Sequence, residues 1–343
     1  MGVNVAVVGV GRWGRNHVRV LSSLRGSLVG RIVVVDADEA RASSVAKQFA
    51  VDAYYSSVEE LVKDEKDLDA AVVAVPTVYH FEVASKLLNY ADVLVEKPLA
   101  ATLDEGYRLV ELSRKLGRRL AVGHIERFNP VVGAAYAAVR GKEILSMESK
   151  RLGPGPAREY TLNLGVAHDL LVHDVDVVNM FLGEPPGRVF AYKIDGGDFP
   201  FEVEVTALYE YSQRRIATLS ASWRTVPSYK HRSLTIRLPD SVIRVDYILR
   251  RIVVDRGVQE LPRDSLRVPV FAEESYVEVS YLQEEPLKAE LIDFLEAVKL
   301  GGKPRVDGLA GYVALKCVVK ALESASKGVP VPIGWDEIEK LSS

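Results

Sequence analysis

The stretch Val3-Asn4-Val5-Ala6-Val7-Val8-Gly9-Val10-Gly11-Arg12-Trp13-Gly14 decides the fold of the first part of the chain. A Val-rich run of strand length leads into the pattern G-x-G-x-x-G, and a helical segment follows. Gly9 permits a tight turn, Gly11 lets the backbone approach a pyrophosphate, and Gly14 lets helix and strand pack closely. The freed N–H groups and the helix dipole would then face an anion. The alternative is a strand-to-helix turn without a ligand.

An acidic partner for this loop stands at Asp36, which ends the next Val-rich run about twenty residues on, as a dinucleotide-binding loop requires. A carboxylate at this position accepts hydrogen bonds from the ribose hydroxyls of NAD. The 2′-phosphate of NADP would meet like charge there. Ala37-Asp38-Glu39 offers no cation to offset that charge, although Arg41 lies one helical turn further. NAD is therefore the predicted cofactor, and NADP is less favoured.

The first third of the chain continues this alternation of Val-rich strands and helices. Strands apolar on both faces and separated by helices predict a parallel sheet covered on each side, in a doubly wound Rossmann arrangement. The predicted strands are Val3–Val8, Arg31–Asp36, Asp69–Val75, Val93–Glu96 and Arg119–Val122. The predicted helices are Trp13–Leu24, Glu39–Phe49, Val58–Val62, Val78–Leu88 and Leu103–Leu116.

Beyond Val122–Pro130 the pattern changes to period-two alternation, with one buried and one more polar face in each run. The predicted strands there are Glu202–Tyr211, Arg215–Trp223, Ser233–Leu238 and Ile243–Tyr247. The predicted helices are Pro130–Val139, Gly165–Leu182, Leu287–Leu300 and Leu309–Lys327. We therefore predict an α/β chain: a dinucleotide-binding domain over 1–123 and an α+β domain over 124–343 with a large open antiparallel sheet. The last helices are expected to pack back near the interface.

Composition narrows the class of protein. The 343 residues carry 44 Lys and Arg against 47 Asp and Glu, so no basic surplus exists to neutralise nucleic-acid phosphates. The one cysteine, Cys317, excludes a disulfide framework and fits a reducing cytoplasm. Neither a basic secretory start nor an apolar run of about twenty residues is present, so we expect a cytoplasmic protein without a membrane segment.

Two further motifs follow predicted strands of the first domain. Pro76-Thr77-Val78-Tyr79-His80 comes after the strand that ends at Val75, and Glu96-Lys97-Pro98 ends the next strand. Ligands of doubly wound folds bind beyond the carboxyl ends of the strands, where both motifs would lie. Because Pro98 biases Lys97 away from helical geometry, the lysine is expected at the edge of the sheet. The alternative is a solvated lysine beside a turn.

The predicted helix Gly165–Leu182 carries ionisable side chains on one stripe. Asp169, His173 and Asp176 recur at i, i+4 and i+7 and so are expected to share one face. Such a stripe on an apolar helix indicates a site. The alternatives are a capping and salt-bridge network, or a metal site, for which His and Asp are suitable ligands.

Taken together, these motifs resemble those of the glucose-fructose oxidoreductase, inositol dehydrogenase and rhizopine-catabolism (Gfo/Idh/MocA) family of NAD(P)-dependent sugar dehydrogenases. The resemblance spans nearly the whole chain, including Gly123-His124-Ile125-Glu126-Arg127-Phe128-Asn129-Pro130. Leu171 departs from the glycine that the family usually carries two residues after the helix aspartate, which affects local packing more than chemistry.

The resemblance implies roles for the motifs. Lys97 would hydrogen-bond the reacting hydroxyl, His173 would take its proton as general base, and Asp169 would orient the histidine or bind a sugar hydroxyl. Family members place the nicotinamide above the Lys-Pro turn, often with a cis peptide before the proline. No metal is implied. The residues expected to bind the cofactor are Gly9, Gly11, Arg12, Trp13, Gly14, Asp36, Pro76, Thr77, His80, Glu96 and Lys97.

The substrate is predicted less narrowly. Gly123–Pro130 resembles members described as UDP-N-acetylglucosamine 3-dehydrogenases, which favours a nucleotide sugar; a free sugar or cyclitol is the alternative. The Gly/Pro-rich stretch Arg151–Tyr160 carries two arginines that could hold a diphosphate or carboxylate, unless it is a solvated loop. Arg127, Arg158 and Tyr160 are the candidate substrate-binding residues.

Two other classes of protein stay open as alternatives. A metal-dependent hydrolase would need more ligands near His168–Asp176, and a non-catalytic NAD-binding sensor would need no base. A homodimer or homotetramer is also expected, because an open sheet with apolar residues on its outer face needs a cover. The residues predicted for that face are Val189, Phe190, Tyr192, Val205, Tyr209 and Trp223.

Overall fold

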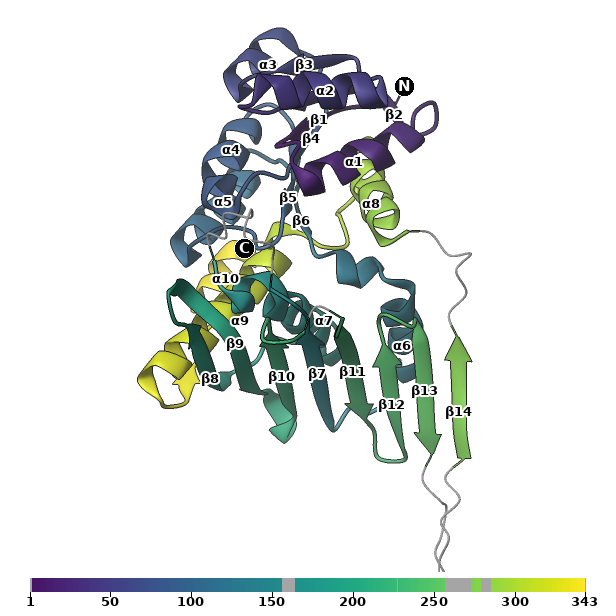
Figure 1. The fold of residues 1–343 in the computed structure, drawn as a ribbon, viewed down its shortest axis with the longest axis vertical. Helices are drawn as coiled ribbons and strands as arrows, with labels where there is room; N and C mark the ends of the chain where they lie inside the picture. The colour runs from purple at the N-terminus through teal and green to yellow at the C-terminus, as the bar shows by residue number, and fades with distance from the viewer. Residues whose placement is uncertain (1, 156–163, 227, 257–272, 279–284, 343) are drawn as a thin grey trace, which may run out of the picture. The chain divides into compact units, whose positions relative to one another are not determined.

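The computed structural model describes residues 2–155, 164–226, 228–256, 273–278 and 285–342 (Figure 1). The chain divides into two compact units. The first comprises residues 1–128, 285–319 and 335–343, and the second comprises residues 129–284 and 320–334.

The first unit is built around a parallel sheet with the strand order β3-β2-β1-β4-β5-β6 in the described chain. Its strands are β1 (Val3–Val8), β2 (Val29–Val35), β3 (Ala53–Tyr55), β4 (Ala70–Val73), β5 (Asp92–Glu96) and β6 (Leu120–Gly123). All of β4 and β5 is buried, as the continuous apolar runs predicted. The predicted doubly wound sheet is confirmed, with β3 as an edge strand that the sequence pattern missed because it is short and only partly buried.

Three of the described helices of this unit begin where the sequence supplies a side-chain cap. Asp38, Ser57 and Thr102 each accept a backbone N–H at a helix start, and Thr102 forms a capping box with Glu105. The helices are α1 (Arg12–Ser23), α2 (Glu39–Phe49), α3 (Val58–Asp64), η1 (Thr77–Tyr79), α4 (His80–Leu87), α5 (Leu103–Lys115) and η2 (Ile125–Phe128).

Segments from the end of the chain also belong to the first unit. Helix α8 (Pro286–Leu300) buries Leu291 and Phe294 in the core that holds Val5 and Val7 of β1. The part of α9 (Gly308–Lys327) up to Val319 and helix α10 (Asp336–Ser342) join the same unit. The compact units therefore differ from the predicted ranges 1–123 and 124–343, because apolar burial groups residues by contact and not by chain order.

The second unit contains a mixed, mainly antiparallel sheet in the order β14-β13-β12-β11-β7-β10-β9-β8-β15. Its strands are β7 (Ser146–Leu152), β8 (Arg188–Gly196), β9 (Phe199–Glu210), β10 (Ile216–Ser222), β11 (His231–Arg237), β12 (Ser241–Asp246), β13 (Arg251–Arg256), β14 (Glu273–Glu278) and β15 (Val331–Pro332). The predicted class, with a large sheet here, is confirmed. One detail differs: β7 and β10 pair in parallel.

The helices of this unit are α6 (Pro130–Val139), the π-helical turn η3 (Ala167–Leu171), α7 (Val172–Leu182) and the short η4 (Ser212–Arg214). The η3 turn contacts β9 and β10, α7 contacts β7 and β10, and α6 contacts β12 and β13. Helices therefore pack along the sheet in its centre and toward β13, and the alternating strands bury one face.

The sequence-based expectation for the outer face of this sheet needs a correction. Val189, Val205, Tyr209 and Trp223 are buried, because they lie on the other side of the pleat. Phe190 and Tyr192 do lie outside, and Tyr192 is 73% exposed. Leu208, which pairs with Phe190 across the strands, joins them. The exposed apolar patch is therefore Phe190, Tyr192 and Leu208.

In the part of the chain that the structure describes, no helix combines the length and apolar character needed to cross a membrane. Cys317 is buried within α9.

Candidate active site

The glycine loop has the geometry that close approach of a ligand requires. Gly9 has a φ of +86°, a conformation that favours glycine. A Cβ at Gly14 would lie 1.8 Å from the carbonyl oxygen of Gly9, so only glycine lets the loop and α1 pack this closely. A Cβ at Gly11 would meet nothing within 4 Å among the described atoms. Since no side chain caps the described start of α1, these residues fit a dinucleotide pyrophosphate.

Asp36 lies directly beside this loop. One carboxylate oxygen accepts the backbone N–H of Val10 at 2.9 Å, and the other accepts that of Asp38 at 3.0 Å. The guanidinium of Arg41 lies 3.1 Å from the same carboxylate and 2.9 Å from that of Asp38. Arg41, near the start of α2, thus contacts Asp36 directly, which the sequence alone did not indicate.

The strand order reverses between β1 and β4, and ligands of such sheets bind beyond the carboxyl ends of the strands near this point. The Lys97-Pro98 turn follows β5 at the same edge, and its peptide bond is cis. The indole N–H of Trp13, in the glycine loop, donates to the carboxylate of Glu96. This hydrogen bond joins the glycine loop to the residue before Lys97.

Glu96 itself is enclosed by neighbouring residues. One carboxylate oxygen lies 2.7 Å from Nε2 of His17, and the other accepts the backbone N–H of Lys97 at 3.3 Å. Glu96 is 8% exposed and His17 is fully buried. Both carboxylate oxygens of Glu96 therefore have partners within the protein, and its direct contact with the cofactor stays a prediction.

The segment after β4 contains both accessible and buried residues. Pro76 is exposed and Thr77 is half-buried, whereas His80 is 1% exposed. The two ring nitrogens of His80 lie 2.9 Å from the carbonyl oxygen of Pro98 and 3.0 Å from that of Val75. These contacts of His80 connect the Lys97-Pro98 turn to the segment after β4, and its predicted contact with the cofactor stays a prediction.

In the second unit, the predicted continuous helix begins with the π-helical turn η3, a form frequent at functional sites. Asp169 lies in this turn and His173 in the first turn of α7, and both are half-buried. Asp176 is 1% exposed, so of the three predicted residues only Asp169 and His173 reach the surface.

The start of this helix is held by Glu202, a residue that the sequence pattern placed on the polar face of its strand. The pairing of β8 with β9 skips Val203, and this irregularity turns Glu202 inward. Its carboxylate accepts the backbone N–H of Ala167 at 3.0 Å. A Cβ at Gly165 would lie 2.1 Å from that carboxylate, so glycine gives it room. Burial raises the pKa of Glu202.

Arg151 is a second correction. It lies in β7, 1% exposed, and its guanidinium is 2.8 Å from the carboxylate of Asp174 on α7. The arginine therefore anchors α7 to the sheet and is neither a diphosphate ligand nor part of a solvated loop. The neighbouring His168 is also buried, and burial lowers its pKa to about 4. His168 is thus neutral near neutral pH.

Of the candidate substrate-binding residues, Arg127 lies half-buried in η2. Arg158 and Tyr160 lie outside the described residues. No three His, Cys, Asp or Glu side chains of the described chain gather as metal ligands would.

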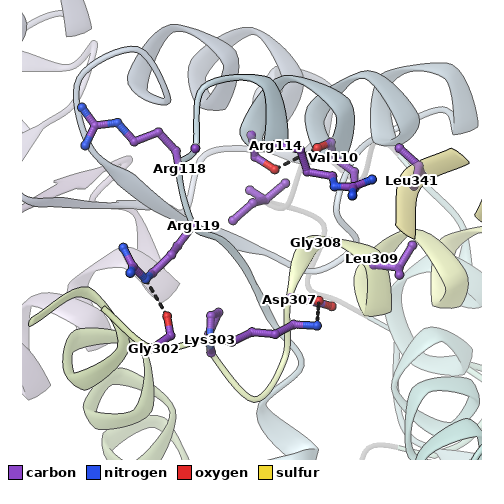
Figure 2. A pocket seen from close by; sticks show the side chains of 14 residues that line it. Val110, Arg114, Arg118, Arg119, Gly302, Lys303, Asp307, Gly308, Leu309 and Leu341 are labelled. Carbon is purple, nitrogen blue, oxygen red and sulfur yellow. Dashed lines mark hydrogen bonds and ion pairs between the residues drawn. The ribbon is translucent and has the colours of Figure 1, made fainter. Parts of the chain in front are cut away.

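A pocket of about 440 Å³ lies elsewhere in the first unit (Figure 2). It is lined by the end of α5, the start of β6 and the segment from Gly302 to Leu309. Lys303 pairs with Asp307 beside it, at 2.7 Å. The pocket shares no residue with the glycine loop or with the Lys97 turn, so it is distinct from the candidate site.

Comparison with known proteins identifies the class. The sequence model of an "oxidoreductase family, NAD-binding Rossmann fold" matches residues 3–124, and that of a "GFO/IDH/MocA C-terminal domain" matches residues 143–240. The protein is therefore an oxidoreductase with an NAD-binding domain, as predicted. The chain belongs to the Gfo/Idh/MocA family.

Individual relatives support this assignment. UDP-N-acetylglucosamine 3-dehydrogenase of Acidithiobacillus ferrooxidans is 28% identical over 93% of this chain and 96% of its own. Its solved structure matches with a TM-score of 0.82 at 25% identity, covering 95% and 98% of the two chains. Myo-inositol dehydrogenase Hyg17 of Streptomyces leeuwenhoekii is 32% identical over 64% of this chain and 69% of its own. A levoglucosan dehydrogenase complex with NADH and levoglucosan has a TM-score of 0.84 at 18% identity, covering 98% and 100%; this likeness shows the fold alone.

Proposed function

We propose that this oxidoreductase transfers hydride between NAD and a secondary alcohol of a sugar or nucleotide sugar, with Lys97, His173 and Asp169 at the reacting centre. The observation that carries the proposal is the hydrogen bond between Trp13 and Glu96. It joins the loop suited to a pyrophosphate to the residue before Lys97, so one dinucleotide can lie on the loop with its nicotinamide near the lysine.

The residues that would hold the cofactor are the glycines of the loop, Asp36 at the ribose, and Pro76 and Thr77 beyond β4. Bound NAD supplies the hydride acceptor. The ammonium group of Lys97 hydrogen-bonds the substrate hydroxyl and stabilises the negative charge that develops on its oxygen.

In the second unit, His173 is the proposed general base that accepts the proton of the substrate hydroxyl. As the alcohol carbon loses its hydride, the hydroxyl proton passes to the imidazole, and the C–O bond becomes a carbonyl. His173 is half-buried and so can meet a ligand, whereas the adjacent His168 is buried and has a pKa of about 4. Asp169, one turn earlier, orients the imidazole or binds a neighbouring hydroxyl.

The substrate class is proposed as a nucleotide sugar, with UDP-N-acetylglucosamine oxidised at C3 as the first candidate. Support comes from the relative of that name, which matches this chain over nearly its full length in sequence and in structure. A free sugar or inositol is the second candidate, and the match to the myo-inositol dehydrogenase favours it.

A panel of nucleotide sugars, free sugars and inositols, scored by NADH absorbance, tests the proposed function. On the best substrate, Lys97→Met and His173→Ala should each lower turnover at least about a hundredfold, the range of general acid–base catalysis. Cofactor affinity should stay nearly intact. Lys115→Met and His231→Ala are matched controls that should retain activity. Full activity in either test variant would remove that residue from the mechanism.

We also propose that the chain forms a homodimer or homotetramer through the sheet of the second unit. The exposed apolar patch of Phe190, Tyr192 and Leu208 supports this, because exposed apolar side chains on adjacent strands favour association.

A further inference from the structure

A cluster of buried ionisable side chains adjoins the Lys97 turn, and the proposed reaction assigns it no role. Glu96 ends β5, His17 lies in α1 and Glu290 lies in α8. Their exposures are 8%, 0% and 2%. Helices α1 and α8 pack against each other beside the sheet (Figure 1). Burying three ionisable groups together costs free energy unless their charges are paired, hydrogen-bonded or neutralised.

Glu96 is the ionised member of this cluster. Its oxygens accept hydrogen bonds from the indole of Trp13 and the backbone N–H of Lys97, and one lies 2.7 Å from His17. Burial acts to raise the pKa of Glu96, but the hydrogen bond and charge of His17 and the charge of Lys97 outweigh it, so the pKa is lowered. A Cβ on the neighbouring Gly123 would lie 3.0 Å from the carboxylate, closer than ordinary van der Waals contact, so the glycine gives the carboxylate room.

Glu290 is the neutral member. Among the described residues, neither of its carboxyl oxygens has a hydrogen-bond partner. Burial, and then the negative charges of Glu96 and Asp293, raise its pKa well above the usual range. Two carboxyl groups close together in an apolar core cannot both ionise cheaply, so Glu290 keeps its proton while Glu96 carries the charge. Glu96 is thus the carboxylate of this cluster that carries the negative charge, and it lies between His17 and the Lys97 turn.

A negative charge near the nicotinamide affects the binding of the oxidised and the reduced cofactor differently. The oxidised nicotinamide ring is positively charged and the reduced ring is neutral. A preoriented carboxylate in a water-poor site stabilises the positive form selectively.

We propose that the carboxylate of Glu96, held by His17 and Trp13, makes the site prefer oxidised over reduced nicotinamide. Glu96, His17 and Trp13 are positioning residues here, since they act through the field and through the Lys97 turn. This inference rests on the part of the proposed function that places the nicotinamide near Lys97.

Cofactor binding without substrate tests the inference. Dissociation constants of NAD⁺ and NADH are measured by calorimetry at neutral pH, and Trp13, which is 41% exposed, offers a fluorescence signal for the same titration. Glu96→Gln should weaken NAD⁺ binding about tenfold more than NADH binding, because it removes the charge and keeps the shape. His17→Gln should shift the ratio in the same direction by a smaller factor, and it serves if the Glu96 variant does not fold.

Two further variants make the result specific. Glu290→Gln copies a protonated carboxyl and should leave the ratio within about twofold of the wild type. Glu111→Gln, on the exposed face of α5, controls for loss of any carboxylate. Equal weakening of NAD⁺ and NADH by Glu96→Gln would reduce Glu96 to a structural role and overturn the inference. So would a shift of the ratio in Glu290→Gln, since Glu290 would then carry charge.

The failure of this inference is distinguishable from failure of the proposed function. Turnover of Lys97→Met and His173→Ala decides the roles in the reaction, whereas the ratio of cofactor affinities needs no substrate. Suppose that Glu96→Gln weakens NAD⁺ binding more than NADH binding, as expected, while Lys97→Met stays fully active. The inference about Glu96 would then hold, and Lys97 would be rejected as a catalytic residue.

Discussion

At the scale of single residues, we propose that Asp36 and Arg41 set which dinucleotide the protein accepts. The carboxylate of Asp36 is fixed by two backbone N–H groups, so it cannot turn away from a 2′-phosphate. Arg41 lies against it with its side chain 48% exposed. The guanidinium of Arg41 thus offsets the charge of both Asp36 and Asp38.

Replacing the aspartate should therefore release the arginine. Asp36→Ser removes the like charge, and the guanidinium can then pair with the 2′-phosphate of NADP. We expect NADP affinity to rise at least about tenfold relative to NAD, measured by calorimetric titration with both cofactors. The double variant Asp36→Ser/Arg41→Gln should lose this gain, and Asp36→Ser/Lys47→Gln, altered at an exposed lysine of the same helix, should keep it. An unchanged preference in Asp36→Ser would show that Asp36 does not select the cofactor.

At the scale of secondary-structure elements, the segment η3–α7 depends on contacts from distant strands. Glu202 accepts the N–H of Ala167 at its start, and Arg151 pairs with Asp174 on its inner side. Both partners come from the sheet, so the segment that bears Asp169 and His173 is oriented by the strands below it.

Glu202 also makes this element sensitive to pH. Since burial raises the folded-state pKa of Glu202, its contribution to stability is fully present below the unfolded pKa and is lost as pH rises through the folded pKa. Glu202→Gln keeps the acceptor without the ionisation. In thermal melts, the melting temperature of the variant should therefore rise relative to that of the wild type as pH increases from about 4 to 7.

Glu202→Ala provides the comparison for this prediction. It removes the acceptor and should lower the free energy of unfolding by about 1 kcal/mol near pH 4, the usual contribution of one hydrogen bond. The loss should become smaller as pH rises, because the wild type then loses the contribution of Glu202. A Gln variant that lost stability steadily against the wild type with rising pH would show that Glu202 is favoured as a carboxylate, contrary to this assignment.

At the scale of the whole molecule, association through the second unit is open to direct measurement. Sedimentation equilibrium at micromolar concentration should give a mass above that of one chain. Tyr192→Glu combined with Phe190→Glu should shift it to the monomer, because the charges would be desolvated in the interface. Tyr54→Glu alters an exposed tyrosine of the first unit and should leave the mass unchanged. A monomeric wild type would refute the proposed homo-oligomer.

The sequence predicted the strands of the first unit more completely than those of the second. The parallel sheet followed from runs such as Val3–Val8, which are apolar throughout and so mark strands buried on both faces. Short or half-polar strands, such as β3 and β7, carry no such signal and were missed. Tyr209 was assigned to the wrong face, because alternation shows that a strand has two faces but not which one meets the helices.

The sequence by itself determined the class of the protein. The glycine loop, Asp36, Lys97 and the Asp169–His173 pair are local patterns, and local patterns are legible because backbone geometry and charge constrain them at short range. Only the tertiary structure decided which polar residues serve the protein and which can meet a ligand. The enclosure of Glu96 by His17 and Trp13, the tie formed by His80, the inward turn of Glu202 and the burial of Arg151 all arise from contacts between segments far apart in the chain. Burial and partner choice depend on packing in three dimensions, which no spacing along one chain records.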